Sequence, residues 1–152
     1  MKKRIRRNRK RVILLLFLLF IISSIIFFLD RVTKSIAKRI SFCKFICINY
    51  SINKASAFGL FNSKPLLLIG GFVVAGLVLY LYFKTKDALT RLSFLLIFSG
   101  AIANLYDRLL FGYVIDFITF SFVEIPAFNL ADSSIVLGLL IFLIQLLRNK
   151  AK

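Results

Sequence analysis

Carboxylates are the groups with which this sequence could do acid–base chemistry. The chain of 152 residues contains six acidic residues and no histidine. Asp116 lies within the apolar segment YVIDF, and Asp132 lies in FNLADSS, directly before a long apolar run. Two carboxylates that meet at a low-dielectric boundary cannot both ionise easily, so one keeps a proton and the other is a base. Such a pair predicts aspartic-protease chemistry, in which the base activates water and the acid protonates the carbonyl oxygen or the leaving amine.

Both aspartates also have a structural interpretation. Asp132 precedes an apolar helical run, where an aspartate commonly serves as the N-cap of a helix. This explanation is weaker for Asp116, because an ionisable group within an apolar segment is costly unless it is paired or functional. The residues alone therefore leave helix capping open for Asp132 and favour a functional role for Asp116.

Other polar residues near the apolar runs could hold the two carboxylates or a bound peptide. They are Asp30, Lys34, Asn53, Asn104, Asp107 and Arg108. Asp30 and Lys34 are four residues apart and could equally form a surface pair on a helix. Asp107 and Arg108 could form an ion pair at a helix end, and Asn53 could simply belong to a turn.

Four apolar runs predict the elements that must position these side chains. Hydrophobic residues make up 60% of the chain and its mean hydropathy is +0.89, which is typical of a small integral membrane protein. The runs at about 12–29, 65–83, 92–110 and 129–147 are each long enough to cross a bilayer. The predicted fold is an all-α integral membrane protein with four transmembrane helices, forming a single domain over residues 1–152.

The predicted loop between the first two spans, residues 30–64, is mixed in character. Its first part combines basic and apolar residues, as in a short amphipathic helix at the membrane interface. Ile46, Ile48, Tyr50 and Ile52 then alternate with polar or small residues, which predicts a strand with these four side chains on one buried face. Residues 118–122 show the same alternation and predict a second strand.

The distribution of charge predicts how the chain lies in the membrane. The N-terminal segment, the 84–91 loop and the C-terminal tail together hold 14 of the 22 basic residues and one of the six acidic residues. By the positive-inside rule, both termini lie in the cytoplasm. The carboxylates on the outer side are then Asp30, Asp107, Asp116, Glu124 and Asp132. We assign Glu124 to a loop that takes no part in the chemistry.

Composition also disfavours several kinds of site and partner. The net charge of +16 does not predict nucleic-acid binding, because the basic residues flank apolar runs, where they attract anionic lipid. Cys43 and Cys47 cannot form an ordinary zinc site without histidine or further cysteines. We expect these cysteines to be unpaired, although the sequence leaves open a disulfide between them if they face an oxidising compartment. The sequence predicts no metal, no other cofactor and a monomer.

Five short motifs occur in a fixed order relative to the four spans. They are DRVTK at 30–34, NKASAFG at 53–59, ANLYDR at 103–108, VIDF at 114–117 and FNLAD at 128–132. Each motif is weak alone, but their order over roughly residues 12–147 resembles the lipoprotein signal peptidase family, also called signal peptidase II. Ala55, Ser56 and Ala103 differ from the usual family pattern by small-for-small changes, which leave both aspartates in place.

The resemblance implies a fold, an activity and a set of site residues. It implies a bacterial inner-membrane aspartic endopeptidase without a cofactor, built from four transmembrane helices and a small extracytoplasmic β-cradle. Its partners would be membrane lipid and a diacylglyceryl-modified prolipoprotein, which it would cleave before the lipidated cysteine. By motif match, Asp116 and Asp132 would be catalytic. The residues that would bind substrate or support the site are Asp30, Lys34, Asn53, Gly59, Asn104, Asp107, Arg108, Asn129 and Ala131.

Two other classes of function are open to a small membrane protein with paired carboxylates. A transporter or channel could use Asp116 and Asp132 as a proton relay, but a relay would place its carboxylates near mid-membrane. The sequence also lacks an evident inverted repeat, which many transporters contain. A structural membrane subunit would use the carboxylates only to cap helices, and it predicts that Asp116→Asn is tolerated.

Overall fold

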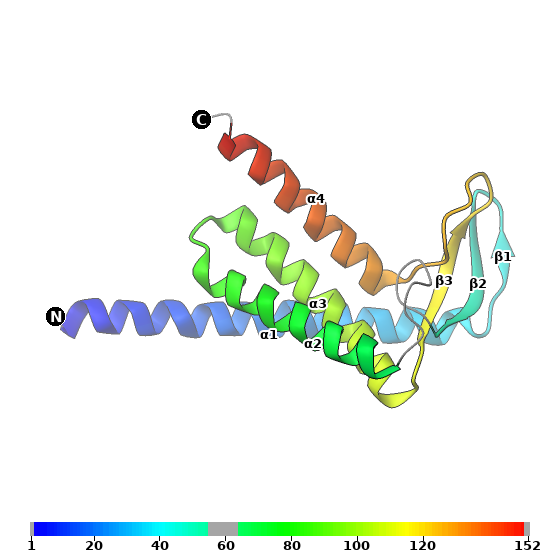
Figure 1. Ribbon diagram of the computed structural model, residues 1–152, viewed down its shortest axis with the longest axis horizontal. Helices are drawn as coiled ribbons and strands as arrows, with labels where there is room; N and C mark the ends of the chain where they lie inside the picture. The colour runs from blue at the N-terminus through cyan, green and yellow to red at the C-terminus, as the bar shows by residue number, and fades with distance from the viewer. Residues whose placement is uncertain (1, 55–63, 151–152) are drawn as a thin grey trace.

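Four long helices form the body of the computed structural model, which describes residues 2–54 and 64–150 (Figure 1). They are α1 (Lys2–Ala37), α2 (Lys64–Lys84), α3 (Ala88–Leu110) and α4 (Leu130–Lys150). Each contains a stretch that is long and apolar enough to span a membrane, and the first such stretch is Val12–Ala37. The predicted fold of four transmembrane helices is therefore confirmed.

The first helix is longer than the predicted span. That span was expected to end near residue 29, whereas α1 continues without a break to Ala37. The reason is that the charged residues beyond position 29 are neutralised inside the protein, so the helix need not end where the apolar run ends. Asp30 and Lys34 pair with each other on one face of α1, and both side chains are buried.

A three-stranded antiparallel sheet stands at one end of the helices (Figure 1). Its strands are β1 (Phe42–Cys43), β2 (Ile46–Asn53) and β3 (Val114–Phe120), in the order β1-β2-β3. Both predicted strands are present, but β3 begins at Val114 and so includes Asp116. The sheet stands where α1 and α3 end and α4 begins, so residues from all of these elements meet there.

The predicted buried face of β2 is wrong. Ile46, Tyr50 and Ile52 are exposed, whereas Cys47 on the opposite face is buried. A register shift between Ile48 and Ser51 also interrupts the alternation. A period of two predicts that one face is apolar, but it does not say whether protein, lipid or a partner covers that face.

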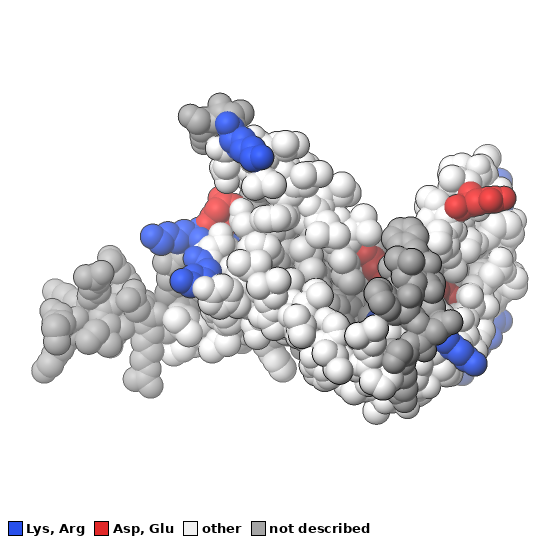
Figure 2. Space-filling model, in the orientation of Figure 1, with Lys and Arg blue, Asp and Glu red and all other residues white. Residues whose placement is uncertain are grey.

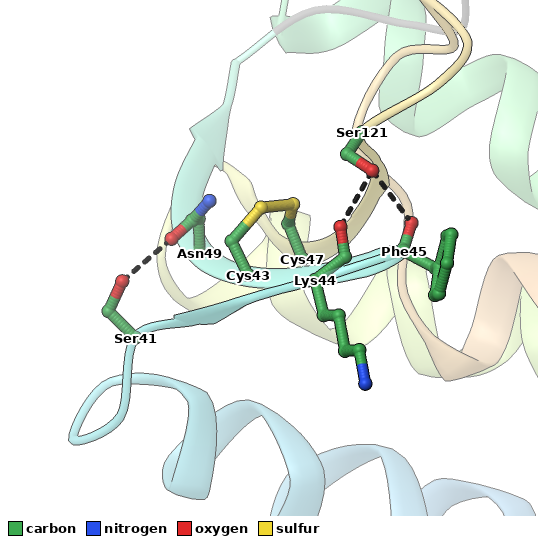
Figure 3. Close-up of a disulfide and its surroundings, with 7 residues drawn as sticks. All are labelled: Ser41, Cys43, Lys44, Phe45, Cys47, Asn49 and Ser121. Atoms are coloured by element: carbon green, nitrogen blue, oxygen red, sulfur yellow. Dashed lines mark hydrogen bonds between the residues drawn. A yellow bond between two sulfur atoms is a disulfide. The ribbon is translucent and has the colours of Figure 1, made fainter.

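A disulfide joins Cys43 and Cys47 across the β1–β2 hairpin (Figure 3). The two residues are directly opposite each other in the sheet, with their Cα atoms 3.9 Å apart. The expectation of unpaired cysteines is therefore wrong, because the turn between the strands brings positions four apart face to face. Ser121, directly after β3, donates its hydroxyl to the carbonyl oxygen of Lys44 at 2.7 Å, which connects the hairpin to the end of β3.

Charged side chains lie at the two ends of the molecule. In Figure 2 the blue and red side chains lie toward these ends, and the surface between them is white. Large apolar side chains such as Phe20 and Val73 are exposed on the helices. Apolar patches of this extent mark a membrane surface. The N-terminal end of α1 and the C-terminal end of α4 both lie away from the sheet, as four crossings require (Figure 1).

The third helix is the centre of the bundle, since it packs against each of the other three helices. Its contact with α4 depends on the absence of a side chain at Gly100. A Cβ atom there would collide with the carbonyl oxygen of Ala131 and would lie 2.8 Å from a side-chain carbon of Ile135. Gly100 therefore sets how closely the first turn of α4 approaches α3.

We expect Gly100→Ala to destabilise the protein by about 1–3 kcal/mol, the usual cost of overpacking a close contact. The measurement is thermal unfolding of the purified protein in detergent. Gly76→Ala is the matched control, because a Cβ atom at Gly76 in α2 would meet nothing within 4 Å. Equal melting temperatures for the two variants would contradict this account of the α3–α4 contact.

Candidate active site

Asp116 lies in the middle of β3, and its side chain is only 2% exposed. Asn53 on β2 donates an amide N–H to Asp116 Oδ2 at 2.8 Å, and Asn129 donates one to Oδ1 at 2.7 Å. Burial raises the pKa of Asp116, and these two amide donors oppose that effect. The carboxyl group is thus held in one orientation and keeps a proton to higher pH than an exposed aspartate.

Asp132 lies in the first turn of α4, where it forms a reciprocal cap with Asn129. The backbone N–H of Asp132 donates to Asn129 Oδ1 at 2.8 Å, and the backbone N–H of Asn129 donates to Asp132 Oδ2 at 3.2 Å. This arrangement is a capping box, in which the N-cap residue is Asn129 and Asp132 occupies the third helical position. The prediction that Asp132 is itself the N-cap is therefore wrong by three residues.

Two asparagines connect the two aspartates. Asn129 is fully buried, and its side-chain amide donates both to Asp116 and, at 3.1 Å, to Asn104 Oδ1. Asn104 in turn donates to Asp132 Oδ1 at 2.7 Å. Every carboxylate oxygen of Asp116 and Asp132 therefore accepts a hydrogen bond from an asparagine. Asp132 is half-buried, so the network retains an accessible side.

A cluster of four charged side chains adjoins this network. Asp30, Arg31 and Lys34 come from α1, and Asp107 comes from α3; we call them the four-charge cluster. Lys34 Nζ lies 2.7 Å from Asp30 Oδ2 and 2.7 Å from Asp107 Oδ2. Lys34, Asp30 and Asp107 are all buried. The surface-pair interpretation of Asp30 and Lys34 is therefore wrong, because their charges are paired in the interior.

The four-charge cluster contacts the asparagine network at two points. Lys34 Nζ donates to Asn104 Oδ1 at 3.5 Å. Asp30 Oδ1 accepts the backbone N–H of Ala131, directly before Asp132, at 3.2 Å. A carboxylate at this position also interacts favourably with the positive end of the α4 dipole. The cluster thus supports both the side chain that binds Asp132 and the helix turn that carries it.

Most of the predicted site residues come together in these two groups. The residues in them are Asp30, Lys34, Asn53, Asn104, Asp107, Asp116, Asn129, Ala131 and Asp132. Arg108 is half-buried at the end of α3, where its charge acts on Asp116 and Asp132. Asp107 pairs with Arg31 and Lys34 of α1, so the alternative of an ion pair between Asp107 and Arg108 is wrong. Gly59 lies outside the described residues, and Glu124 is exposed in a loop.

Arg31 is a site residue that the sequence did not identify. Its guanidinium group donates to Asp30 and to Asp107. The signal that could have found it is the spacing of Phe27 and Arg31, which places an aromatic ring and a cation on the same helix face. Within residues 2–54 and 64–150, histidine, cysteine and carboxylate side chains form no group of three that could hold a metal ion.

Comparison with known proteins gives consistent matches over most of the chain. The family model described as signal peptidase (SPase) II matches residues 22–148. A lipoprotein signal peptidase of Thermodesulfovibrio yellowstonii is 35% identical over 135 residues, covering 82% of this chain and 90% of that protein. A lipoprotein signal peptidase of Clostridium tetani is 39% identical over 134 residues, covering 79% of this chain and 86% of that protein.

Two solved structures share the fold. Both are described as bacterial membrane enzymes solved by the in meso method. The one at 2.3 Å resolution has a TM-score of 0.80 and 28% identity, covering 87% of this chain and 88% of its own. The one at 1.9 Å resolution has a TM-score of 0.76 and 29% identity, covering 85% of this chain and 92% of its own.

Proposed function

The chain belongs to the signal peptidase II family, and we propose that it is an aspartic endopeptidase with Asp116 and Asp132 as its catalytic pair. Membership of this family makes it a multi-pass membrane peptidase that processes lipoprotein signal peptides. The observation that carries the proposal is the position of Asn129. Its side chain binds Asp116 and its backbone N–H binds Asp132, so one residue holds both carboxylates.

In the proposed reaction the two carboxyl groups share one proton. The ionised group takes a proton from water while the water oxygen attacks the scissile carbonyl carbon, and the protonated group donates to the carbonyl oxygen. The tetrahedral intermediate then breaks its C–N bond. The group that took the proton from water passes it to the leaving nitrogen. A hydroxyl of the intermediate returns a proton to the other carboxyl group, which restores the starting state. The asparagine network fixes both groups before the substrate arrives.

We propose a diacylglyceryl-modified prolipoprotein as the substrate, cleaved directly before the lipidated cysteine. The apolar outer surface of the helices supports a substrate that arrives from the surrounding lipid. The basic residues gathered away from the sheet support a cytoplasmic position for both termini. The active site then faces the outer side of the bacterial cytoplasmic membrane, and the protein acts as a monomer.

The test is cleavage of a purified prolipoprotein by the full chain in detergent, followed by mass spectrometry of the products. We expect cleavage only after diacylglyceryl modification, with a product that begins at the lipidated cysteine. A chelator should leave the rate unchanged, because the proposed pair needs no metal. Cleavage at another bond, or loss of activity with the chelator, would count against the proposal.

A proton relay is the less favoured alternative. Five of the six carboxylates of the chain lie at or beyond the sheet end of the helices, and Asp87 lies at the opposite end, at the start of α3. A relay needs ionisable groups along the span between these ends. A pH change inside proteoliposomes that depends on Asp116 would favour the relay over the peptidase pair.

A further inference from the structure

Arg31 is held by aromatic rings as well as by carboxylates. Its guanidinium carbon lies 5.6 Å from the ring centre of Phe27 on α1 and 5.5 Å from that of Tyr106 on α3. The two rings contact each other edge to face at 4.8 Å. Cation–π contacts at such distances are favourable and restrict the plane of the guanidinium group. Arg31 is therefore fixed in position, although its side chain remains 22% exposed.

This fixed orientation directs the guanidinium group at both acids of the four-charge cluster. Nη2 donates to Asp30 Oδ2 at 2.7 Å, and Nη1 donates to Asp107 Oδ1. Lys34 occupies the remaining oxygen of Asp107 and shares the same oxygen of Asp30. With Arg31 present, two cations balance two carboxylates. Without it, two buried carboxylates would share one ammonium group, which is costly in a low-dielectric interior.

The charge balance of this cluster matters to the two aspartates. The cluster faces Arg108 of α3, Asp116 of β3 and Asp132 of α4, and the positive charge of Lys34 acts on both aspartates. Lys34 also binds Asn104, which holds Asp132. If Lys34 alone had to neutralise two acids, its contact with Asn104 would weaken and the surroundings of the pair would become more negative.

We propose that Arg31 is a positioning residue of the peptidase: because it shares the neutralisation of Asp30 and Asp107 with Lys34, Lys34 can also hold Asn104, which in turn holds Asp132. This proposal rests on the proposed function of the aspartate pair. Arg31 itself contacts neither aspartate of the pair in the hydrogen-bond network, so its effect is transmitted through Lys34 and through the helix turn that Asp30 supports.

The experiment compares Arg31→Gln and Arg31→Lys in the full chain, measuring kcat, KM, melting temperature and the pH dependence of kcat. We expect Arg31→Gln to lower kcat about tenfold with little change in KM. Its pH profile should move to higher pH, because loss of a nearby positive charge favours protonated carboxylates. Arg31→Lys restores the positive charge but replaces the two donor nitrogens that bind Asp30 and Asp107 with a single one. It should therefore keep the wild-type pH profile with an intermediate kcat.

Arg39→Gln is the matched control, since Arg39 is exposed just after α1 and should tolerate the same change. A folded Arg31→Gln variant with wild-type kcat and pH profile would overturn the proposal. A loss of activity that only follows a lower melting temperature, with an unmoved pH profile, would overturn it as well. If Arg31→Gln does not fold, wild-type kcat in Arg31→Lys overturns it and a reduced kcat supports it. An inactive wild-type protein would instead refute the proposed function.

Discussion

Asp116→Asn and Asp132→Asn should each lower the rate of prolipoprotein cleavage about a thousandfold or more, because an amide can neither take up nor release the proton that the reaction moves. The measurement is the single-turnover rate with the purified variants in detergent. Glu124→Gln is the control, since this exposed carboxylate lies in a loop and should be dispensable. Activity within about tenfold of wild type in either folded variant would exclude the pair.

The stability of Asp116→Asn provides an independent check on the same residue. Burial raises the pKa of Asp116, so the folded protein binds its proton more tightly than the unfolded chain does. The stability that this proton contributes is present at low pH and is lost as pH rises through the raised pKa. The Asp116→Asn variant has no ionisable group at this position, so its stability does not fall in this way as pH rises. Its melting temperature relative to wild type should therefore increase as pH rises above about 4, the ordinary pKa of an aspartate.

The architecture could be predicted because it depends on local properties of the sequence. Each of the four helices is an apolar run of membrane-spanning length, and β2 shows a clear period of two. The apolar runs also placed Asp116 after the third helix and Asp132 at the start of the fourth, as in the structure. These predictions needed no knowledge of which distant residues meet.

The errors arose where distant residues decide the local structure. The C-terminal part of α1 is stabilised by ion pairs with Asp107, which is 73 residues away from Lys34, so the sequence predicted a separate interfacial helix where α1 continues. The apolar face of β2 looked buried because apolar residues in strands usually contact protein. The cap of α4 could have been found, since an asparagine followed three residues later by an acidic residue resembles a capping box.

Asn129 connects the cap of α4 with the proposed catalytic pair, because this residue performs two tasks with different atoms. Its Oδ1 accepts the backbone N–H of Asp132 and caps α4. Its Nδ2 donates to Asp116 and to Asn104. The two tasks can be separated by substitution, since serine is as good an N-cap as asparagine but has no second polar atom.

Asn129→Ser should therefore keep most of the stability of the wild-type protein and lose about a hundredfold in kcat, because Asp116 loses one of its two amide donors, the one that also connects it to Asp132. Asn129→Ala removes the cap as well and should cost about 1 kcal/mol of stability in addition. The measurements are kcat and thermal unfolding of both variants. A Ser133→Ala variant controls for general sensitivity of this turn, since the Ser133 hydroxyl donates to the backbone carbonyl oxygen of Asn129 and the backbone N–H of Ser133 keeps its own bond to that oxygen.

The outcome separates two explanations of the geometry at the start of α4. If Asn129→Ser retains wild-type kcat, the residue serves as a helix cap and the contact with Asp116 is incidental. If kcat falls while the melting temperature is unchanged, the same side chain that caps the start of α4 also aligns the two carboxylates. In that case the position of Asp132 in the capping box is part of the catalytic arrangement, because the cap fixes the backbone that carries the carboxylate.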